Sequence, residues 1–219
     1  MLWSRTVKIS AARGNPDEDI RLVKRLVQRD ERAFLDVYDF YRRSVYRFLM
    51  HMTGSVAIAE ELTQEVFIVI LDAMCAGTVG QFDPEKGTLE GYLLGIARNL
   101  ARQERRRTHR LVSLDHLMET PEWNRLLETF TQENRTWDAA ALLATRSELR
   151  ILYLAILELP GHYREVVVLC SLQEKSYQEA ARILQCSEGT IGSRMNRAKS
   201  LLGAKLRRSA PDAVNTTGI

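Results

Sequence analysis

The chain has 219 residues, of which 45% are hydrophobic and 27% charged, and its formal net charge is +3 at pH 7. These fractions exclude an intrinsically disordered chain. No apolar run approaches the roughly 20 residues that span a bilayer, which excludes a membrane-spanning protein. Because the amino-terminal segment has no apolar core of the length that a secretory signal requires, we expect a cytosolic protein.

The cysteines and histidines form no motif of a metal site or a nucleophile. Cys75, Cys170 and Cys186 lie far apart and match no metal-ligand spacing. The four histidines, at positions 51, 109, 116 and 162, form no catalytic arrangement. We therefore expect no metal, no cofactor, no catalytic residue and no enzyme. Metal-dependent nuclease activity of the purified protein is the observation that would contradict this expectation.

The first part of the chain predicts four helices that share one core. Asn15 and Pro16 are residue types that begin a helix. The following segment carries an apolar stripe over residues 34–52 at helical spacing and ends at Gly54. A third helix is expected from about Val56 to Cys75.

After a loop dense in Gly and Pro at 76–87, Thr88 is expected to cap a fourth helix. The side chains expected to face inward on the third and fourth helices are Leu62, Val66, Val69, Ile70, Ala73, Leu89, Leu93, Ile96 and Leu100.

The helical pattern weakens over residues 111–147, where Pro121, Trp123 and Trp137 lie among scattered polar residues, and this segment predicts a linker with one short helix in "EWNRLLETF". Periodicity returns at "SELRILYLAILEL". Ser176 and Glu179 have the spacing of a capping box. The sequence therefore predicts an all-α protein with two small helical domains joined by a flexible linker.

The last helix has one apolar and one polar face. Ile191, Met195, Ala198 and Leu202 recur on one side, whereas Thr190, Ser193, Asn196 and Arg197 are expected to face outward or lie in the first turn. Two short helices joined by a tight turn, with the second basic and polar outward, describe a helix-turn-helix, in which Arg suits guanine and Asn suits adenine. The alternative is a solvated helix face that binds nothing.

Positive charge gathers in two blocks. Residues 98–110 carry six arginines against one glutamate, and residues 160–208 carry nine Lys or Arg against four Glu, so each block has a net charge of +5. Residues 111–160 have a net charge of −4. Arg98, Arg102, Arg105 and Arg106 lie in a dense stripe on the fourth helix, which favours a polyanion such as nucleic acid. Phe82 and Asn99 lie nearby in the sequence. An aromatic residue such as Phe82, taken alone, is better explained by a core position.

An acidic face is expected on the third helix. Glu61, Gln64, Glu65 and Phe67 lie near one another, with Leu62 and Val66 turned to the core. A surface of carboxylates repels the phosphates of DNA, so this face is either exposed to solvent only or a binding site for a basic protein.

These features, in this order, resemble the bacterial sigma factors called extracytoplasmic-function (ECF) sigma factors. The segments that carry the resemblance are "AFLDVYDFYRRSVYRFLMHMTG", "AEELTQEVF", "FDPEKGTLEGYLLGIARNLARQERRR" and "LPGHYREVVVLCSLQEKSYQEAARILQCSEGTIGSRMNRAKSLL". The resemblance implies a bacterial, cytoplasmic transcription initiation factor with a flexible amino-terminal arm (1–17), a sigma region 2 domain (18–110), an acidic linker (111–147), a region 4 domain (148–208) and a flexible tail (209–219).

The resemblance also implies partners and site residues. Glu61, Gln64, Glu65 and Phe67 would face the clamp helices of the largest subunit of core RNA polymerase, and the flap of the polymerase is a further expected contact. Duplex and melted promoter DNA, and an inhibitory anti-sigma factor, are the other expected partners. The residues expected at the minus-ten element are Phe82, Arg98, Asn99, Arg102, Arg105 and Arg106, and those expected at the minus-thirty-five element are Thr190, Ser193, Asn196 and Arg197.

The main alternative function is a helix-turn-helix regulator that binds duplex DNA without polymerase. A sigma factor is instead expected to bind promoters weakly on its own, because its two reading surfaces are held apart by a linker and ordering them has a cost.

Overall fold

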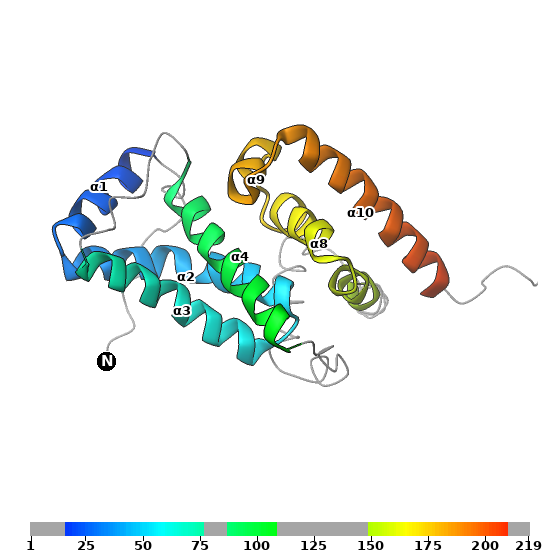
Figure 1. Ribbon diagram of the computed structural model, residues 1–219, viewed down its shortest axis with the longest axis horizontal. Coiled ribbons are helices and arrows are strands. Elements are labelled where there is room, and N and C mark those ends of the chain that lie inside the picture. The colour runs from blue at the N-terminus through cyan, green and yellow to red at the C-terminus, as the bar shows by residue number, and fades with distance from the viewer. Residues whose placement is uncertain (1–15, 77–86, 109–148, 210–219) are drawn as a thin grey trace, which may run out of the picture.

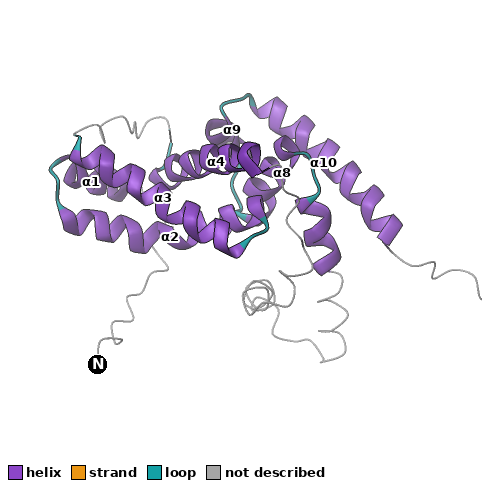
Figure 2. Cartoon of the chain, turned by 60° about the horizontal axis from the view of Figure 1, so that its bottom comes forward, coloured by secondary structure: helices purple, strands orange, loops and turns teal. Residues whose placement is uncertain are grey.

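The computed structural model describes residues 16–76, 87–108 and 149–209 (Figure 1). Every regular element in these ranges is a helix, as the sequence predicts (Figure 2). In the first lobe the helices are α1 (Pro16–Val27), α2 (Glu31–Thr53), α3 (Val56–Cys75) and α4 (Leu89–Thr108). In the second lobe residues 149–157 are helical and are followed by α8 (Gly161–Val167), the π-helical η2 (Val168–Leu172), α9 (Tyr177–Leu184) and α10 (Glu188–Ser209).

Local signals begin and end the helices of the first lobe. The carboxylate of Asp30 accepts a hydrogen bond from the backbone N–H of Arg32 and caps α2. Gly54 ends α2 in the left-handed conformation, at φ +69°, as its position in the sequence indicates. The Thr88 hydroxyl accepts from the N–H of Gly91 at 3.1 Å, which confirms the predicted cap of α4.

The core of the first lobe forms where α2 packs against α1, α3 and α4. Two expectations for α3 are wrong. Val69 was expected to face inward but is 39% exposed, whereas Phe67 was expected to face outward and is 3% exposed. Phe67 lies four residues after the buried Thr63 and three before the buried Ile70, so it shares their helix face. Its ring meets that of Tyr38 edge to face, with 4.8 Å between ring centroids.

A buried carboxylate ties three helices of this lobe together. Asp19 of α1 is 2% exposed. Its Oδ1 accepts from the Tyr41 hydroxyl of α2 at 2.6 Å, and its Oδ2 accepts from the N–H of Leu89, the first residue of α4, at 2.8 Å. Since Leu89 N–H is one of the first-turn donors without an intrahelical acceptor, Asp19 caps α4 from a distant part of the chain.

The second lobe contains the predicted helix-turn-helix. The capping box at the start of α9 is confirmed, because Ser176 accepts from the N–H of Glu179 while the Glu179 carboxylate accepts from the N–H of Ser176. The turn passes through Gln185, at φ +53°. Ser187 then caps α10 by accepting from the N–H of Thr190 at 3.2 Å. The apolar face of α10 is buried as predicted, with Ile191, Met195 and Ala198 at 3% exposure or less.

The two lobes pack against each other, and the expectation that the linker holds them apart is wrong for this structure. One continuous set of buried apolar residues runs through both lobes, and α4 lies beside α9 (Figure 1). Small residues of the first lobe permit this approach: a Cβ added to Gly54 would lie 2.8 Å from Cδ1 of Leu157, and one added to Gly91 would lie 3.6 Å from Cγ1 of Ile183. Burial of apolar surface across the boundary therefore favours the closed arrangement.

Candidate nucleic-acid and protein interfaces

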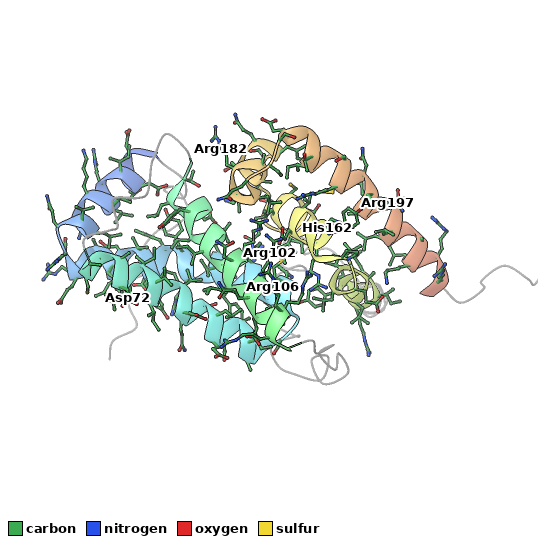
Figure 3. The ribbon with its side chains drawn as sticks, in the orientation of Figure 1. Asp72, Arg102, Arg106, His162, Arg182 and Arg197 are labelled. Atoms are coloured by element: carbon green, nitrogen blue, oxygen red, sulfur yellow. The ribbon has the colours of Figure 1, made fainter. Side chains whose placement is uncertain are left out.

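The polar face of α10 is open to solvent. Ser193, Asn196 and Arg197 are exposed and Thr190 is half-buried. The Thr190 hydroxyl is 2.9 Å from that of Ser187, and the Ser193 hydroxyl donates to the carbonyl oxygen of Thr190 at 3.0 Å. Figure 3 places Arg197 along α10. Asn196 and Arg197 lie more than two turns after Glu188, the first residue of the helix. These two residues have the donors and acceptors that suit base edges in a major groove.

The arginine stripe of α4 is divided between solvent and the second lobe. Asn99, Arg102, Arg105 and Arg106 are exposed, as a nucleic-acid surface requires. Arg98 is not, since only 9% of the residue is exposed. In this arrangement Arg98 is therefore covered, whereas Arg102, Arg105 and Arg106 of the predicted stripe face solvent. Phe82, the aromatic residue expected nearby, lies outside the described residues, as do His109 and Arg110.

The buried group that holds this part of the stripe is Glu165 of α8, whose side chain is 3% exposed. Its Oε2 lies 3.1 Å from Nε of Arg98, and its Oε1 lies 3.5 Å from Nε of Arg102. The contact with Arg98 is an ion pair rather than a well-directed hydrogen bond, since neither Arg98 Nε nor Glu165 Oε2 meets hydrogen-bond geometry. Sequence reasoning missed Glu165, and the only available signal was a carboxylate directly before an apolar run, "EVVVL".

A further ion pair, away from Glu165, crosses the boundary between the lobes. Nζ of Lys175 lies 2.6 Å from Oε2 of Glu90, and both side chains are 14% exposed or less. The Ser44 hydroxyl of α2 donates to the other carboxylate oxygen of Glu90. Nη2 of Arg47 donates to the carbonyl oxygen of Leu172 at 3.0 Å, which adds a contact from α2 to the end of η2.

Arg164 and Tyr153 fasten the second lobe to the end of α2. Nη1 of Arg164 donates to the carbonyl oxygen of Met52 at 2.6 Å, and its Nη2 donates to Leu159 at 3.2 Å and also to Leu157. Burial, helped by the positive charge of Arg105, lowers the pKa of Arg164 to about 10. The Tyr153 hydroxyl donates to the carbonyl oxygen of Met50 at 3.1 Å.

The outer face of α3 combines acidic and apolar side chains. Glu61, Gln64 and Glu65 are exposed, as predicted, but Phe67 is buried behind them. Ile68 is 54% exposed and takes part in the same surface together with Val69. Sequence reasoning missed this apolar part, because it assigned Val69 to the core.

The described residues contain no group of three or more His, Cys, Asp or Glu that could hold a metal ion. Cys75, Cys170 and Cys186 are free thiols, and burial raises the pKa of the Cys170 thiol. None of the helices described is both long and apolar enough to cross a membrane.

Two family models match the chain. Sigma-70 region 2 matches residues 37–111, and Sigma-70 region 4 matches residues 149–202. Among curated proteins, the chain is similar to the ECF RNA polymerase sigma factor SigW of Bacillus subtilis (strain 168), with 28% identity over 185 residues that cover 84% of this chain and 95% of SigW.

Two solved structures share the fold. CnrH, solved in complex with the cytosolic domain of CnrY, aligns with a TM-score of 0.60 at 21% identity, covering 88% of this chain and 99% of CnrH. The sigma factor RpoE, solved in complex with the anti-sigma factor NepR from Bartonella quintana, aligns with a TM-score of 0.53 at 20% identity, covering 81% of this chain and 98% of RpoE.

A region 2 match over the first lobe and a region 4 match over the helix-turn-helix lobe occur in one chain. The similarity to SigW runs through both lobes and spans nearly the whole length of SigW. The chain therefore belongs to the ECF subfamily of RNA polymerase sigma factors.

Proposed function

We propose that the chain binds core RNA polymerase through the outer face of α3 and directs it to promoters by opening the minus-ten element with the first lobe and reading the minus-thirty-five element with α10. The observation that carries the proposal is the exposed polar face of a correctly capped recognition helix, joined in one chain to a lobe whose α4 is rich in arginine. Neither feature alone implies promoter-specific initiation.

On α10, Asn196 and Arg197 are proposed to read base edges, and Thr190 and Ser193 to contact phosphate or base at the start of the helix. A helix amino-terminus lying in the major groove presents backbone N–H groups to a phosphate, which positions the reading side chains. The exposure of Asn196 and Arg197 supports this assignment.

On the first lobe, Asn99, Arg102, Arg105 and Arg106 are proposed to contact the melted minus-ten strand, with Arg98 joining them once its ion pair opens. An extruded base needs a stacking wall and a polar group that reads its edge. Asn99 is proposed for the edge and Phe82 for the wall.

On α3, Glu61, Gln64 and Glu65 are proposed to meet the clamp helices of polymerase, with Ile68 and Val69 adding apolar contact. Phe67 supports this face from inside through its contact with Tyr38 and does not itself reach a partner. An anti-sigma factor is a further proposed partner, because RpoE, which shares the fold of this chain, was solved in complex with the anti-sigma factor NepR.

Run-off transcription with core polymerase, with and without the chain, tests the proposal. The chain is expected to confer specific initiation on a subset of promoters, and a failure of core polymerase to start RNA chains any better in its presence would overturn it.

One observation favours a second function. Since the reading face of α10 is exposed while part of the α4 stripe is covered, the free chain is also suited to duplex DNA as a stand-alone regulator. Tight, sequence-specific duplex binding by the free chain, unchanged by polymerase, would support this second function.

A further inference from the structure

The contact between α4 and α8 brings together a carboxylate of one lobe and cationic groups of the other. Glu165, Arg98 and Arg102 form a small ion cluster that is nearly dry at Glu165 and Arg98 and half open at Arg102, whose side chain is 46% exposed. In Figure 3, Arg102 lies between α4 and α8. Arg105 extends the contact, because its guanidinium covers Gly161 so closely that an added Cβ would overlap it.

We propose that Glu165 is the acid of an intramolecular latch, which holds Arg98 and Arg102 against the second lobe and withholds them from single-stranded DNA until the lobes separate. This inference rests on the proposed function, in which these arginines contact the melted minus-ten strand. A carboxylate can take the place of a phosphate because both present oxygens that a guanidinium can bind, and both are anionic. The chain therefore supplies its own competitor for the DNA strand.

The latch can open and close reversibly, because many of the contacts between the two lobes are polar and each lobe has a core of its own. Each lobe has its own capped helices and buried apolar residues, so opening need not unfold either one. The polar groups that cross the boundary include Lys175, Glu90, Arg164 and Tyr153, and water can satisfy them after separation. The apolar contacts of Leu157 and Ile183 with the first lobe oppose opening.

The latch is asymmetric with respect to the two DNA-binding surfaces. Among the described residues, Glu165 forms its ion pairs with Arg98 and Arg102 of α4, while Asn196 and Arg197 on α10 stay exposed in the closed arrangement. Closure is thus expected to suppress binding of a melted strand more than binding of a duplex.

Two variants of the full chain test the latch. Glu165→Gln keeps the size of the side chain and removes its charge. Lys175→Gln breaks the ion pair between Lys175 and Glu90, which lies away from the arginine stripe. Because it removes a positive charge, its effect on charge alone should be to weaken DNA binding. The matched control is Glu158→Gln, which removes one negative charge from the exposed pair of Glu158 with Lys205 within the second lobe. Far-UV circular dichroism confirms that each variant folds.

Two measurements are made on each protein without polymerase. Hydrogen–deuterium exchange reports the protection of α4 and α8. Fluorescence anisotropy with a labelled, mixed-sequence single-stranded 20-nucleotide DNA reports affinity over a range of salt concentrations. Glu165→Gln and Lys175→Gln are expected to lose protection in both helices and to bind the single strand roughly fivefold or more tightly with a steeper salt dependence, because more guanidinium groups reach phosphates. Glu158→Gln is expected to show the same hydrogen–deuterium exchange as the parent. Its affinity for the single strand is expected to rise only by the small amount that the loss of one negative charge produces.

Unchanged exchange in Glu165→Gln and Lys175→Gln relative to the control would overturn the latch. Loss of protection without a gain in DNA affinity would also overturn it, and would place the error in the assignment of Arg98 and Arg102 to DNA rather than in the closed packing. Run-off transcription separates these results from a failure of the proposed function, since Glu165→Gln is expected to support initiation with core polymerase at least as well as the parent.

Discussion

The carboxylate of Asp19 and the hydroxyl of Tyr41 are joined by a hydrogen bond of 2.6 Å in the interior of the first lobe. The same carboxylate accepts from the N–H of Leu89, so one side chain fixes α1, α2 and the start of α4 relative to one another. Burial and this hydrogen bond raise the pKa of Tyr41, which stays a neutral donor at all physiological pH values. The arrangement explains how α4, which follows a loop, is set at a fixed position on the lobe.

Asp19→Ala is expected to lower the free energy of unfolding by about 2 to 4 kcal/mol, because it leaves a buried hydroxyl and a buried N–H without their acceptor. Tyr41→Phe removes the donor to one carboxylate oxygen of Asp19 and leaves the bond from Leu89 in place, and it is expected to lower the free energy of unfolding by about 1.5 to 3 kcal/mol, the range for a hydrogen bond to a charged group. Urea denaturation followed by circular dichroism measures both. Asp39→Asn, at an exposed position of α2, is the control. A change in Asp19→Ala no larger than that in the control would contradict the role assigned to Asp19.

Two glycines are expected to respond oppositely to alanine. Gly54→Ala places a side chain at φ +69° and 2.8 Å from Leu157, so it is expected to cost about 1 to 3 kcal/mol through backbone strain and overpacking. Gly95 lies in α4 with no neighbouring atom within 4 Å of an added Cβ, and Gly95→Ala is expected to stabilise the chain by about 0.5 to 1 kcal/mol through helix propensity. Thermal unfolding measures both changes. Stabilisation by Gly54→Ala would contradict the close approach of the lobes.

His51 is expected to make stability depend on pH. It is 0% exposed and its ring meets Tyr153 with 5.6 Å between centroids. Burial, helped by the positive charge of Arg47, lowers the pKa of His51 from 6.5 to about 3. Between these values the unfolded chain binds a proton that the folded chain does not, so the free energy of unfolding falls as pH decreases below about 6.5. The slope is at most about 1.4 kcal/mol per pH unit.

Urea denaturation at pH 7, 6 and 5 measures this effect above the range where most carboxylates titrate. His51→Phe is expected to abolish most of the slope, whereas His162→Gln, at an exposed position, is expected to keep it. An equal slope in His51→Phe and the parent would show that another group is responsible.

The elements of this fold could be predicted from the sequence where local chemistry decides them. Gly54, Thr88, Ser176 and Ser187 mark helix boundaries through backbone hydrogen bonds within a few residues, and the structure confirms each. The apolar face of α10 follows from the spacing of its residues alone, and the exposed polar face on the opposite side follows from that.

The errors fall where distant segments meet. Phe67 and Val69 lie two positions apart on α3, and only the placement of α2 and α4 decides which of them is covered. A glutamate such as Glu165 is expected at the surface from its sequence alone, and it is buried here because two arginines of the distant α4 pair with it. The spacing of residues within one helix contains no information about such a partner, so the closed arrangement of the lobes could not be predicted.

Charge reversal on α3 is expected to weaken polymerase binding. The double variant Glu61→Lys, Glu65→Lys places two positive charges on a face proposed to meet a basic partner, and like-charge contact there is expected to weaken binding roughly tenfold or more. The control is Glu31→Lys, Asp39→Lys, which makes the same change in net charge at exposed positions of α2. Competition with a labelled parent chain for core polymerase measures both. Equal binding of the two double variants would assign the polymerase contact to another surface.

Arg197 and Arg208 provide a matched pair on α10, since both are exposed and carry the same charge, but only Arg197 lies on the proposed reading face. A guanidinium that binds a guanine edge through two hydrogen bonds discriminates against other bases by about 1 to 3 kcal/mol. Arg197→Ala is therefore expected to erase the preference at one base pair of the upstream element, while Arg208→Ala lowers affinity evenly across sequences and keeps that preference. Selection of bound duplexes from a random library by the polymerase complex of each variant measures the difference. If Arg197→Ala selects the same motif as the parent, α10 reads its site through other side chains, of which Asn196 is the first to replace.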